Sequence, residues 1–190
     1  MTATAKASMV DMAVRLLAEE GYQATSFSAV LARSGAPRGS IYHHFPGGKD
    51  ELIELALNVH AERTFAHLAE LRGSDAEEIV RAFTAAWRQG LVYTDFAVGC
   101  SILAVTASAG PGRLRDRAGQ LFRDWRTLLA DLLVAGGVDQ SEATAFAAQL
   151  LAAVEGAVAI SRAEHSIEVF DVVTAQLVRG ATGLPRRAPS

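Results

Sequence analysis

Cysteine is almost absent from this chain. Cys100 is the only one in 190 residues, which excludes an intramolecular disulfide and any zinc site built from several cysteines. A lone thiol fits a reducing compartment. Charged residues also interrupt the first twenty positions, where a signal peptide would need an apolar run. We therefore expect a cytoplasmic protein with no metal site and no cofactor.

Long apolar runs and strand-forming residues are scarce as well. The longest stretch without a charged residue, Phe96 to Gly112, is shorter than a membrane span and contains glycine and proline. Aromatic residues make up 7% of the chain, and alanine and leucine dominate the apolar set, which favours helices over strands. The sequence predicts an all-α protein that does not interact with a membrane.

Capping residues, glycines and prolines divide the chain into about nine predicted helices. In chain order they run from about Met9 to Gly21, after Ser26 to Gly35, from Pro37 to Pro46, from Asp50 to Leu71, after Ser74 to Gly90, from Phe96 to Ala107, through Leu114 to Leu132, after Asp139 to Ala163, and after Ser166. Ser74 and Glu77 fit a capping box, and Asp139 with Glu142 caps the eighth helix.

Acidic residues are unevenly distributed, although the net charge of −3 is unusual for a DNA-binding protein. None occurs between Tyr22 and Lys49, and a local basic face is enough to bind phosphates. We predict a helix-turn-helix DNA-binding domain over residues 1–48, made of three helices, and a helical ligand-binding and dimerisation domain over residues 49–182. Residues 183–190 carry two prolines and two arginines and are predicted to be a disordered tail.

Two short predicted helices, separated by a turn at Gly35, lie in this acid-poor segment. The N-terminal end of the second helix of a helix-turn-helix enters the major groove. Small residues there permit close approach, and Arg38 can reach guanine or a phosphate. Tyr42 and His43 suit phosphate oxygens, and Lys49 at the next helix start can clamp a phosphate together with free N–H groups. The predicted DNA contacts are Ser26, Arg33, Pro37, Arg38, Gly39, Ser40, Tyr42, His43 and Lys49.

The block Gly39-Ser40-Ile41-Tyr42-His43-His44-Phe45, followed by Lys49, resembles the motif that ends the helix-turn-helix of the TetR family. The flanking segments Pro37-Arg38-Gly39-Ser40 and Pro46-Gly47-Gly48-Lys49 are similar to the LmrA/YxaF-like branch. The resemblance covers about fifty N-terminal residues, and the remainder matches in helix count and general character. It implies a homodimeric repressor that small, often aromatic or drug-like, molecules release from DNA. Leu31 and Arg33 depart from the pattern, because the family usually has small alanines there.

Several of these residues have a simpler explanation. Tyr42 and Phe45 can be aromatics that pack between helices, which is the favoured interpretation for Phe45. Arg33 is either a phosphate contact or a solvated surface residue. The adjacent His43 and His44 diverge on a helix and have no third ligand at a suitable spacing, which argues against a metal site.

Aromatic residues recur in three successive predicted helices of the C-terminal two thirds. Each one is most simply a core residue, but together they can line a cavity for a planar apolar ligand. Glu155, inside an apolar run, is either a polar handle for that ligand or a rim residue. The predicted ligand-binding residues are Phe83, Trp87, Phe96, Cys100, Leu103, Phe122, Trp125 and Glu155.

Small side chains form one face of the eighth predicted helix and allow a partner helix to approach closely. With apolar residues of the last helix, this face can build a two-fold four-helix interface, and the resemblance implies the same location. The predicted interface residues are Ala145, Ala148, Ala152, Gly156, Ala159, Val169, Val172, Val173 and Leu177.

These features predict a repressor that binds a palindromic double-stranded DNA operator as a homodimer and is released by a small apolar or aromatic effector. An enzyme is disfavoured, because the sequence shows no nucleophile with its base, no phosphate loop and no metal set. The alternative is a helical small-molecule-binding or interaction protein whose DNA-binding head does not function. Repressor and activator are not distinguished, since the sign of regulation depends on where the operator lies.

Overall fold

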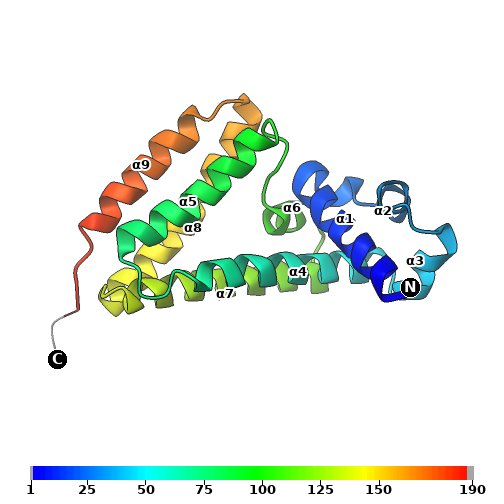
Figure 1. Ribbon diagram of the computed structural model, residues 1–190, viewed down its shortest axis with the longest axis horizontal. Helices are drawn as coiled ribbons and strands as arrows, with labels where there is room; N and C mark the ends of the chain where they lie inside the picture. The colour runs from blue at the N-terminus through cyan, green and yellow to red at the C-terminus, as the bar shows by residue number, and fades with distance from the viewer. Residues whose placement is uncertain (1, 188–190) are drawn as a thin grey trace. The chain divides into compact units, whose positions relative to one another are not determined.

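The residues that the structure describes, 2–187, are mainly helical, as the sequence predicts. The computed structural model contains nine α-helices and no β-strand within that range (Figure 1). Their bounds are α1 Thr2–Ala24, α2 Phe27–Ser34, α3 Arg38–His44, α4 Lys49–Ala69, α5 Ala76–Tyr93, α6 Ser101–Ser108, α7 Arg113–Ala135, α8 Gln140–Glu164 and α9 Glu168–Thr182.

The helices group into two compact units. Unit 1 comprises Met1–Arg63 and Cys100–Leu121, and unit 2 comprises Thr64–Gly99 and Phe122–Ser190. Helices α4 and α7 each begin in unit 1 and end in unit 2. The compact units therefore differ from a single cut after residue 48, because α6 joins the N-terminal helices. The functional division into residues 1–48 and 49–182 stays a prediction.

Unit 1 is built around α1, which packs against α6 and α2. Met9, Leu16 and Leu17 are buried on one face of α1, because apolar residues recur there at helical spacing. Gly21 interrupts the helix with a φ of 81°, and the chain continues helically to Ala24. The predicted end of the first helix near Gly21 corresponds to this interruption.

Local capping sets the bounds of α2 and α3. The Ser26 hydroxyl accepts a hydrogen bond from the N–H of Ala29 at 3.2 Å, and Gly35 ends α2 with a left-handed φ of 67°. Both predicted signals are confirmed. Pro37 was expected at the first helical position of α3 but is its N-cap residue, with an extended ψ of 137°. The helix therefore begins one residue later, at Arg38.

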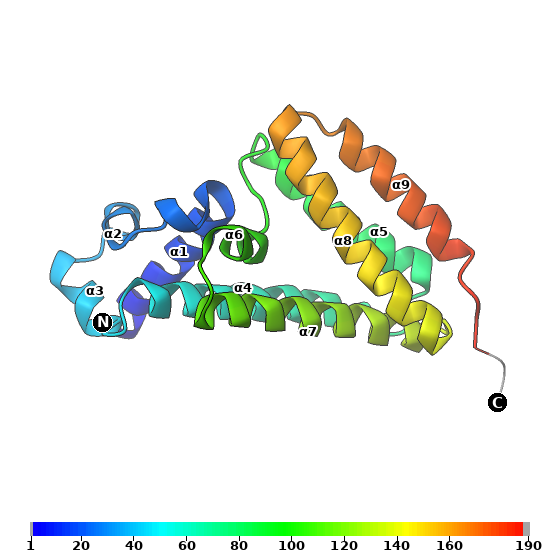
Figure 2. The same ribbon diagram turned by 180° about the vertical axis from the view of Figure 1, so that it is seen from behind.

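Unit 2 contains α5, α8 and α9, which pack against one another (Figure 2). Helix α8 is apolar and long enough to span a membrane by length and composition, and half of that apolar window is buried inside the protein. Its buried side chains include Phe146, Leu150 and Val154. Packing against α5 and α9 accounts for the apolar character of α8, as in the core helix of a globular domain.

The predicted start and end of α5 and the predicted N-cap of α9 each differ from the structure. Asp75, and not Ser74, caps α5, because its carboxylate accepts the N–H of Glu78 at 2.9 Å. Gly90 does not end α5, which continues to Tyr93. The N-cap residue of α9 is Ile167, one position after the predicted Ser166, although the Ser166 hydroxyl accepts the N–H of Glu168 at 3.3 Å.

The predicted helix from Phe96 to Ala107 is wrong in its first turn. Asp95 and Phe96 have left-handed φ values of 50° and 61°, and α6 begins only at Ser101. Within unit 2, the Arg162 guanidinium donates hydrogen bonds to the carbonyl oxygens of Phe96 at 3.3 Å and Ala97 at 2.9 Å. A contact with α8 therefore satisfies carbonyls that a continuous helix would have bonded internally.

Residues 183–187 pair with the loop between α7 and α8. The Asp139 N–H donates to the Pro185 carbonyl at 3.0 Å, and the Arg187 N–H donates to the Gly137 carbonyl at 2.9 Å. Residues 183–187 differ from the predicted disordered tail, because their backbone groups bond to the loop between α7 and α8. The remaining three residues of that tail lie outside the described range.

Candidate nucleic-acid interface

Helix α3 presents one buried and one exposed side. Ile41 is fully buried and anchors the helix, whereas Arg38, Gly39 and His43 are exposed. A Cβ atom added at Gly39 would meet nothing within 4 Å, so its backbone is open to a partner. The Ser40 hydroxyl donates to the Pro37 carbonyl at 2.7 Å, which leaves its oxygen able to accept. The exposed side combines small residues with positive or titratable groups.

An aromatic contact fixes Tyr42 on this exposed side. Its ring lies 5.5 Å from the Phe27 ring of α2 in an edge-to-face arrangement, yet 70% of the residue remains exposed. Phe45 is buried and its ring lies 6.3 Å from that of Phe27. Phe45 therefore packs between helices, as its favoured interpretation predicts, whereas the Tyr42 hydroxyl is presented outward.

Arg33 pairs with two carboxylates of α1. Its guanidinium bonds to Glu20 and lies 3.7 Å from Glu19. The Arg33 side chain remains partly exposed at the surface, and both interpretations of it, a phosphate contact or a solvated surface residue, stay open. Ser26 is also engaged, since it caps α2 and shares a hydrogen bond with the Ser28 hydroxyl at 2.9 Å. Their DNA contacts stay predictions.

Lys49 makes contacts that sequence reasoning missed. Its ammonium group donates to the Tyr22 carbonyl at 2.7 Å and lies 3.5 Å from the Gln23 carbonyl and 4.1 Å from the centre of the Tyr22 ring. Burial lowers the pKa of Lys49, and the charge of Asp50 partly opposes that effect. The lysine side chain therefore bonds to the end of α1 in this structure.

Tyr22 and Lys6 are the functional candidates absent from the sequence prediction. The Tyr22 hydroxyl donates to the Asp50 carboxylate at 3.2 Å, and burial, then the charge of Asp50 and this hydrogen bond, raise the pKa of Tyr22. The Lys6 ammonium lies 5.5 Å from the centre of the Phe45 ring, beside the end of α3. Sequence spacing carries no signal for either contact, because the partners are far apart along the chain.

Comparisons with known proteins cover most of the chain. Residues 76–176 match the family described as "Transcriptional regulator LmrA/YxaF-like, C-terminal domain", and residues 9–56 match "Bacterial regulatory proteins, tetR family". An uncharacterized HTH-type transcriptional regulator of Mycobacterium tuberculosis is 36% identical over 176 residues, 89% of this chain and 90% of that protein. The chain belongs to the TetR family of transcriptional regulators.

Further relatives place this TetR-family regulator in the LmrA/YxaF-like branch, which confirms the resemblance of the helix-turn-helix motif. The HTH-type transcriptional regulator LmrA of Bacillus subtilis is 28% identical over 157 residues, 80% of this chain and 84% of that protein. The crystal structure of a TetR transcriptional regulator from Legionella pneumophila has a TM-score of 0.82 at 21% identity, over 92% of this chain and 95% of that one, and shares the fold. The regulator has a DNA-binding N-terminal domain and is not an enzyme.

Unit 2 of the regulator brings together three of the predicted ligand-binding residues. Trp125 is buried, with its ring 5.8 Å from Phe83 edge-to-face and 6.4 Å from Trp87 in a stacked arrangement. In the described part of the chain, the Trp125 indole N–H has no hydrogen-bond partner. The Phe96 ring instead lies against His165 in a tilted arrangement, with ring centres 4.8 Å apart.

The other predicted ligand-binding residues lie elsewhere in the two units. Phe122 is half-buried at the start of the unit 2 part of α7, and Glu155 is buried on α8. Cys100 and Leu103 belong to unit 1, where the Cys100 sulfur caps α6 by accepting the Leu103 N–H at 3.4 Å. The ligand-binding set as a whole stays a prediction.

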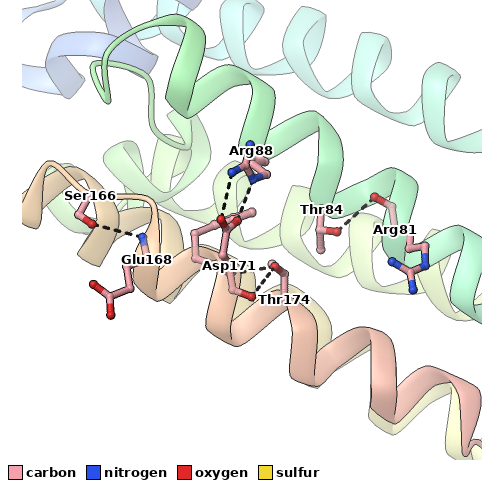
Figure 3. A network of polar contacts seen from close by, with 8 residues as sticks. Arg81, Thr84, Arg88, Ser166, Glu168, Asp171 and Thr174 are labelled. Atoms are coloured by element: carbon pink, nitrogen blue, oxygen red, sulfur yellow. Dashed lines mark hydrogen bonds and ion pairs between the residues drawn. The ribbon is translucent and has the colours of Figure 1, made fainter.

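A separate groove of about 550 Å³ lies between α5 and α9 and contains none of the predicted ligand residues. Figure 3 shows its polar rim, where the Arg88 guanidinium donates to both oxygens of Asp171 at 2.8 and 3.0 Å. The hydroxyls of Thr84 and Thr174 each bond to carbonyls of their own helix. The Arg88–Asp171 bonds join α5 to α9, whereas the two threonine hydroxyls already donate within their own helices.

Proposed function

We propose that this regulator is a repressor that binds a palindromic operator as a homodimer and leaves it when a small apolar or aromatic effector binds. The observation that carries the proposal is the exposed side of α3, where small residues and Arg38 stand at the N-terminal end and Tyr42 and His43 follow. That arrangement suits a helix whose N-terminal end enters the major groove.

Each residue on this face has a distinct proposed role. Arg38 reads guanine O6 and N7 or holds a phosphate, because its fork of donors matches both acceptors. Pro37, Gly39 and Ser40 keep the helix end narrow enough for close approach to base edges. Tyr42 and His43 bind phosphates, and the Phe27 ring supports Tyr42 from α2.

Homodimerisation is supported by the unpaired face of α8. Ala145, Ala152, Gly156 and Ala159 are exposed on this helix in the single chain, and Ala148 is half-buried beside them. On α9, Val172 is 59% exposed. Leu177 does not belong to the interface as predicted, because it is buried within its own unit. A partner helix can approach the small residues closely and cover the exposed valine.

Effector release follows as a shift between two conformers. Two recognition helices of a dimer must lie about one DNA turn apart to enter successive major grooves. An effector that prefers a conformer with another spacing lowers operator affinity by its differential affinity for the two conformers. The cluster of Phe83, Trp87 and Trp125, in which Phe83 and Trp125 are buried, supports an aromatic effector, because its rings offer edge and face contacts.

Selection of duplex DNA from a random library by the purified regulator, at two salt concentrations, tests the DNA-binding proposal. We expect a palindrome to be enriched, with binding that weakens steeply as salt rises and that is lost in Arg38→Ala. Arg72→Ala is the matched control, since Arg72 is exposed in unit 2 and should leave operator binding unchanged. Enrichment of no sequence from folded protein would favour the helical binding protein with an inactive DNA-binding head.

Effector response is tested with a library of small aromatic compounds against the regulator bound to its selected operator. A compound that releases the DNA should do so less effectively from Phe122→Trp, which adds bulk one helical turn before Trp125 on α7, while operator affinity stays near wild type. Equal loss of DNA binding and of effector response would argue against separate sites. Placement of the operator relative to a promoter in a reporter distinguishes repression from activation.

A further inference from the structure

The last carbonyl groups of α1 receive their hydrogen bonds from residues outside the helix's regular pattern. The final carbonyl groups of a helix lack partners in the next turn and must be satisfied from elsewhere. The Thr25 hydroxyl donates to the Gly21 carbonyl at 2.8 Å, and the Ser26 N–H donates to the Ala24 carbonyl at 2.8 Å. The Tyr22 carbonyl, between them, receives its side-chain bond from Lys49, which lies 27 residues along the chain.

Lys49 suits this position for electrostatic reasons. A positive group at a helix C-terminus is stabilised by the negative end of the helix dipole and by direct bonds to terminal carbonyls. The same ammonium lies over the face of the Tyr22 ring, 4.1 Å from its centre, within the range of a cation–π contact. One lysine therefore contacts both the backbone and the side chain of Tyr22.

A second hydrogen bond joins Tyr22 to the start of α4. The Tyr22 hydroxyl donates to the carboxylate of Asp50, the neighbour of Lys49 in the first turn of α4. Tyr22 precedes α2, and Lys49 follows α3, so the two bonds join both ends of the helix-turn-helix segment. We name Tyr22, Lys49 and Asp50 the clasp.

We propose that the clasp positions the helix-turn-helix for DNA, and that Lys49 acts as a positioning residue through Tyr22 instead of as a phosphate contact. The inference rests on α3 being the DNA-reading helix. Closing the segment at both ends fixes where α2 starts and where α3 ends, which restricts the orientations open to the exposed side of α3. Preorganisation of this kind raises affinity without any added contact.

A double-mutant cycle on operator binding tests the proposal. Operator affinity is measured for wild type, Lys49→Met, Tyr22→Leu and the double variant, at several salt concentrations, with folding of each verified by circular dichroism. We expect Lys49→Met to bind about tenfold more weakly and the two effects to be less than additive, because Tyr22→Leu removes the ring contact and the bond to Asp50 but leaves the carbonyl to which Lys49 donates. The slope of log affinity against log salt should match wild type in all four.

Two results would overturn the clasp. If Lys49 contacts a phosphate, Lys49→Met alone should reduce the salt slope by about 0.9 for each protomer bound, and its effect should add to that of Tyr22→Leu. If the contacts serve stability alone, the folded variants should bind the operator as tightly as wild type. Arg72→Ala controls for the loss of one positive charge outside unit 1.

Hydrogen exchange in the free regulator provides a readout that does not need DNA. Lys49→Met and Tyr22→Leu should each speed exchange of the hydrogen-bonded amides of α2, from Ala29 onward, at least about tenfold, while amides of α5 and α8 keep their rates. Unchanged exchange in α2 would reject the clasp even if the operator is bound. Failure of wild type to select any DNA would reject the proposed function and leave this measurement to decide on the clasp.

Discussion

At the scale of single residues, the pKa of His60 on α4 is changed by its surroundings. Burial lowers the pKa of His60 below its ordinary value of 6.5, and the positive charge of Arg63 lowers it further. The folded chain therefore takes up the His60 proton only at a lower pH than the unfolded chain. Between these two pKa values the unfolded state binds more protons, so this residue reduces stability as the pH falls below about 6.5.

The pH dependence can be measured on His60→Gln. The free energy of unfolding, obtained by denaturant titration at pH 7.5 and pH 5.5, should fall more for wild type than for the variant, which has no imidazole to titrate. The other four histidines are unchanged in the comparison and act as an internal control. An equal fall in both proteins would show that burial of His60 does not couple to folding.

Gly136 is required for a steric reason. A Cβ atom at this position would lie 2.4 Å from the backbone carbonyl oxygen of Ser74, which cannot move like a side chain. Gly136→Ala should therefore lower the free energy of unfolding by about 1–3 kcal/mol, as overpacking does. The control is Gly90→Ala in α5, where a Cβ would meet nothing within 4 Å and the helix should gain up to about 1 kcal/mol. Equal effects of both substitutions would contradict the steric explanation.

At the scale of elements, α2 depends on its caps because it has only eight residues. Ser26→Ala removes the acceptor for the Ala29 N–H and should lower the free energy of unfolding by about 1 kcal/mol. Ser26→Asp retains a capping oxygen and should preserve stability, measured by denaturant titration. The same variant separates the cap from the predicted DNA contact, because a carboxylate facing a phosphate would weaken operator binding. Unchanged operator affinity would remove Ser26 from the contacts.

The loop before α6 depends on a contact with Arg162 of α8. The apolar run from Phe96 has a composition suited to a helix, but Asp95 and Phe96 adopt left-handed backbone conformations. Arg162 of α8 bonds to the carbonyls of the following turn, and a Cβ at Gly99 would lie 2.3 Å from its guanidinium nitrogen. The loop is therefore shaped by a side chain more than sixty residues away, which hydrophobic periodicity does not encode.

At the scale of the whole molecule, the proposed homodimer makes the exposed face of α8 essential to operator binding. Gly156→Glu places a charge in the middle of that face and should raise the dimer dissociation constant more than about tenfold, because an unpaired charge is costly to bury. Sedimentation velocity reports the dissociation, and operator affinity should fall with it. The control is Ala86→Glu, on an exposed position of α5. A dimer that tolerates Gly156→Glu would place the interface elsewhere.

The sequence alone determined the helical class, the caps at Ser26, Gly35 and Asp139, and the motif of the helix-turn-helix. Ser26, Gly35 and Asp139 act on neighbours within four residues, so their roles can be predicted from local spacing. The family assignment rested on the contiguous block from Gly39 to Phe45, and the comparisons confirmed it. Local order of this kind requires no knowledge of which helices meet.

Only the tertiary structure decided which distant polar groups meet. Lys49 bonds to Tyr22 and Arg33 bonds to Glu20, contacts that the sequence did not predict, while the DNA contacts predicted for Lys49 and Arg33 stay predictions. The grouping of α6 with unit 1 and the pairing of residues 183–187 with the loop after α7 are of the same kind. Hydrophobic periodicity indicates which face of a helix is apolar. The partner of a long charged side chain depends instead on which polar groups of other helices the fold brings within its reach.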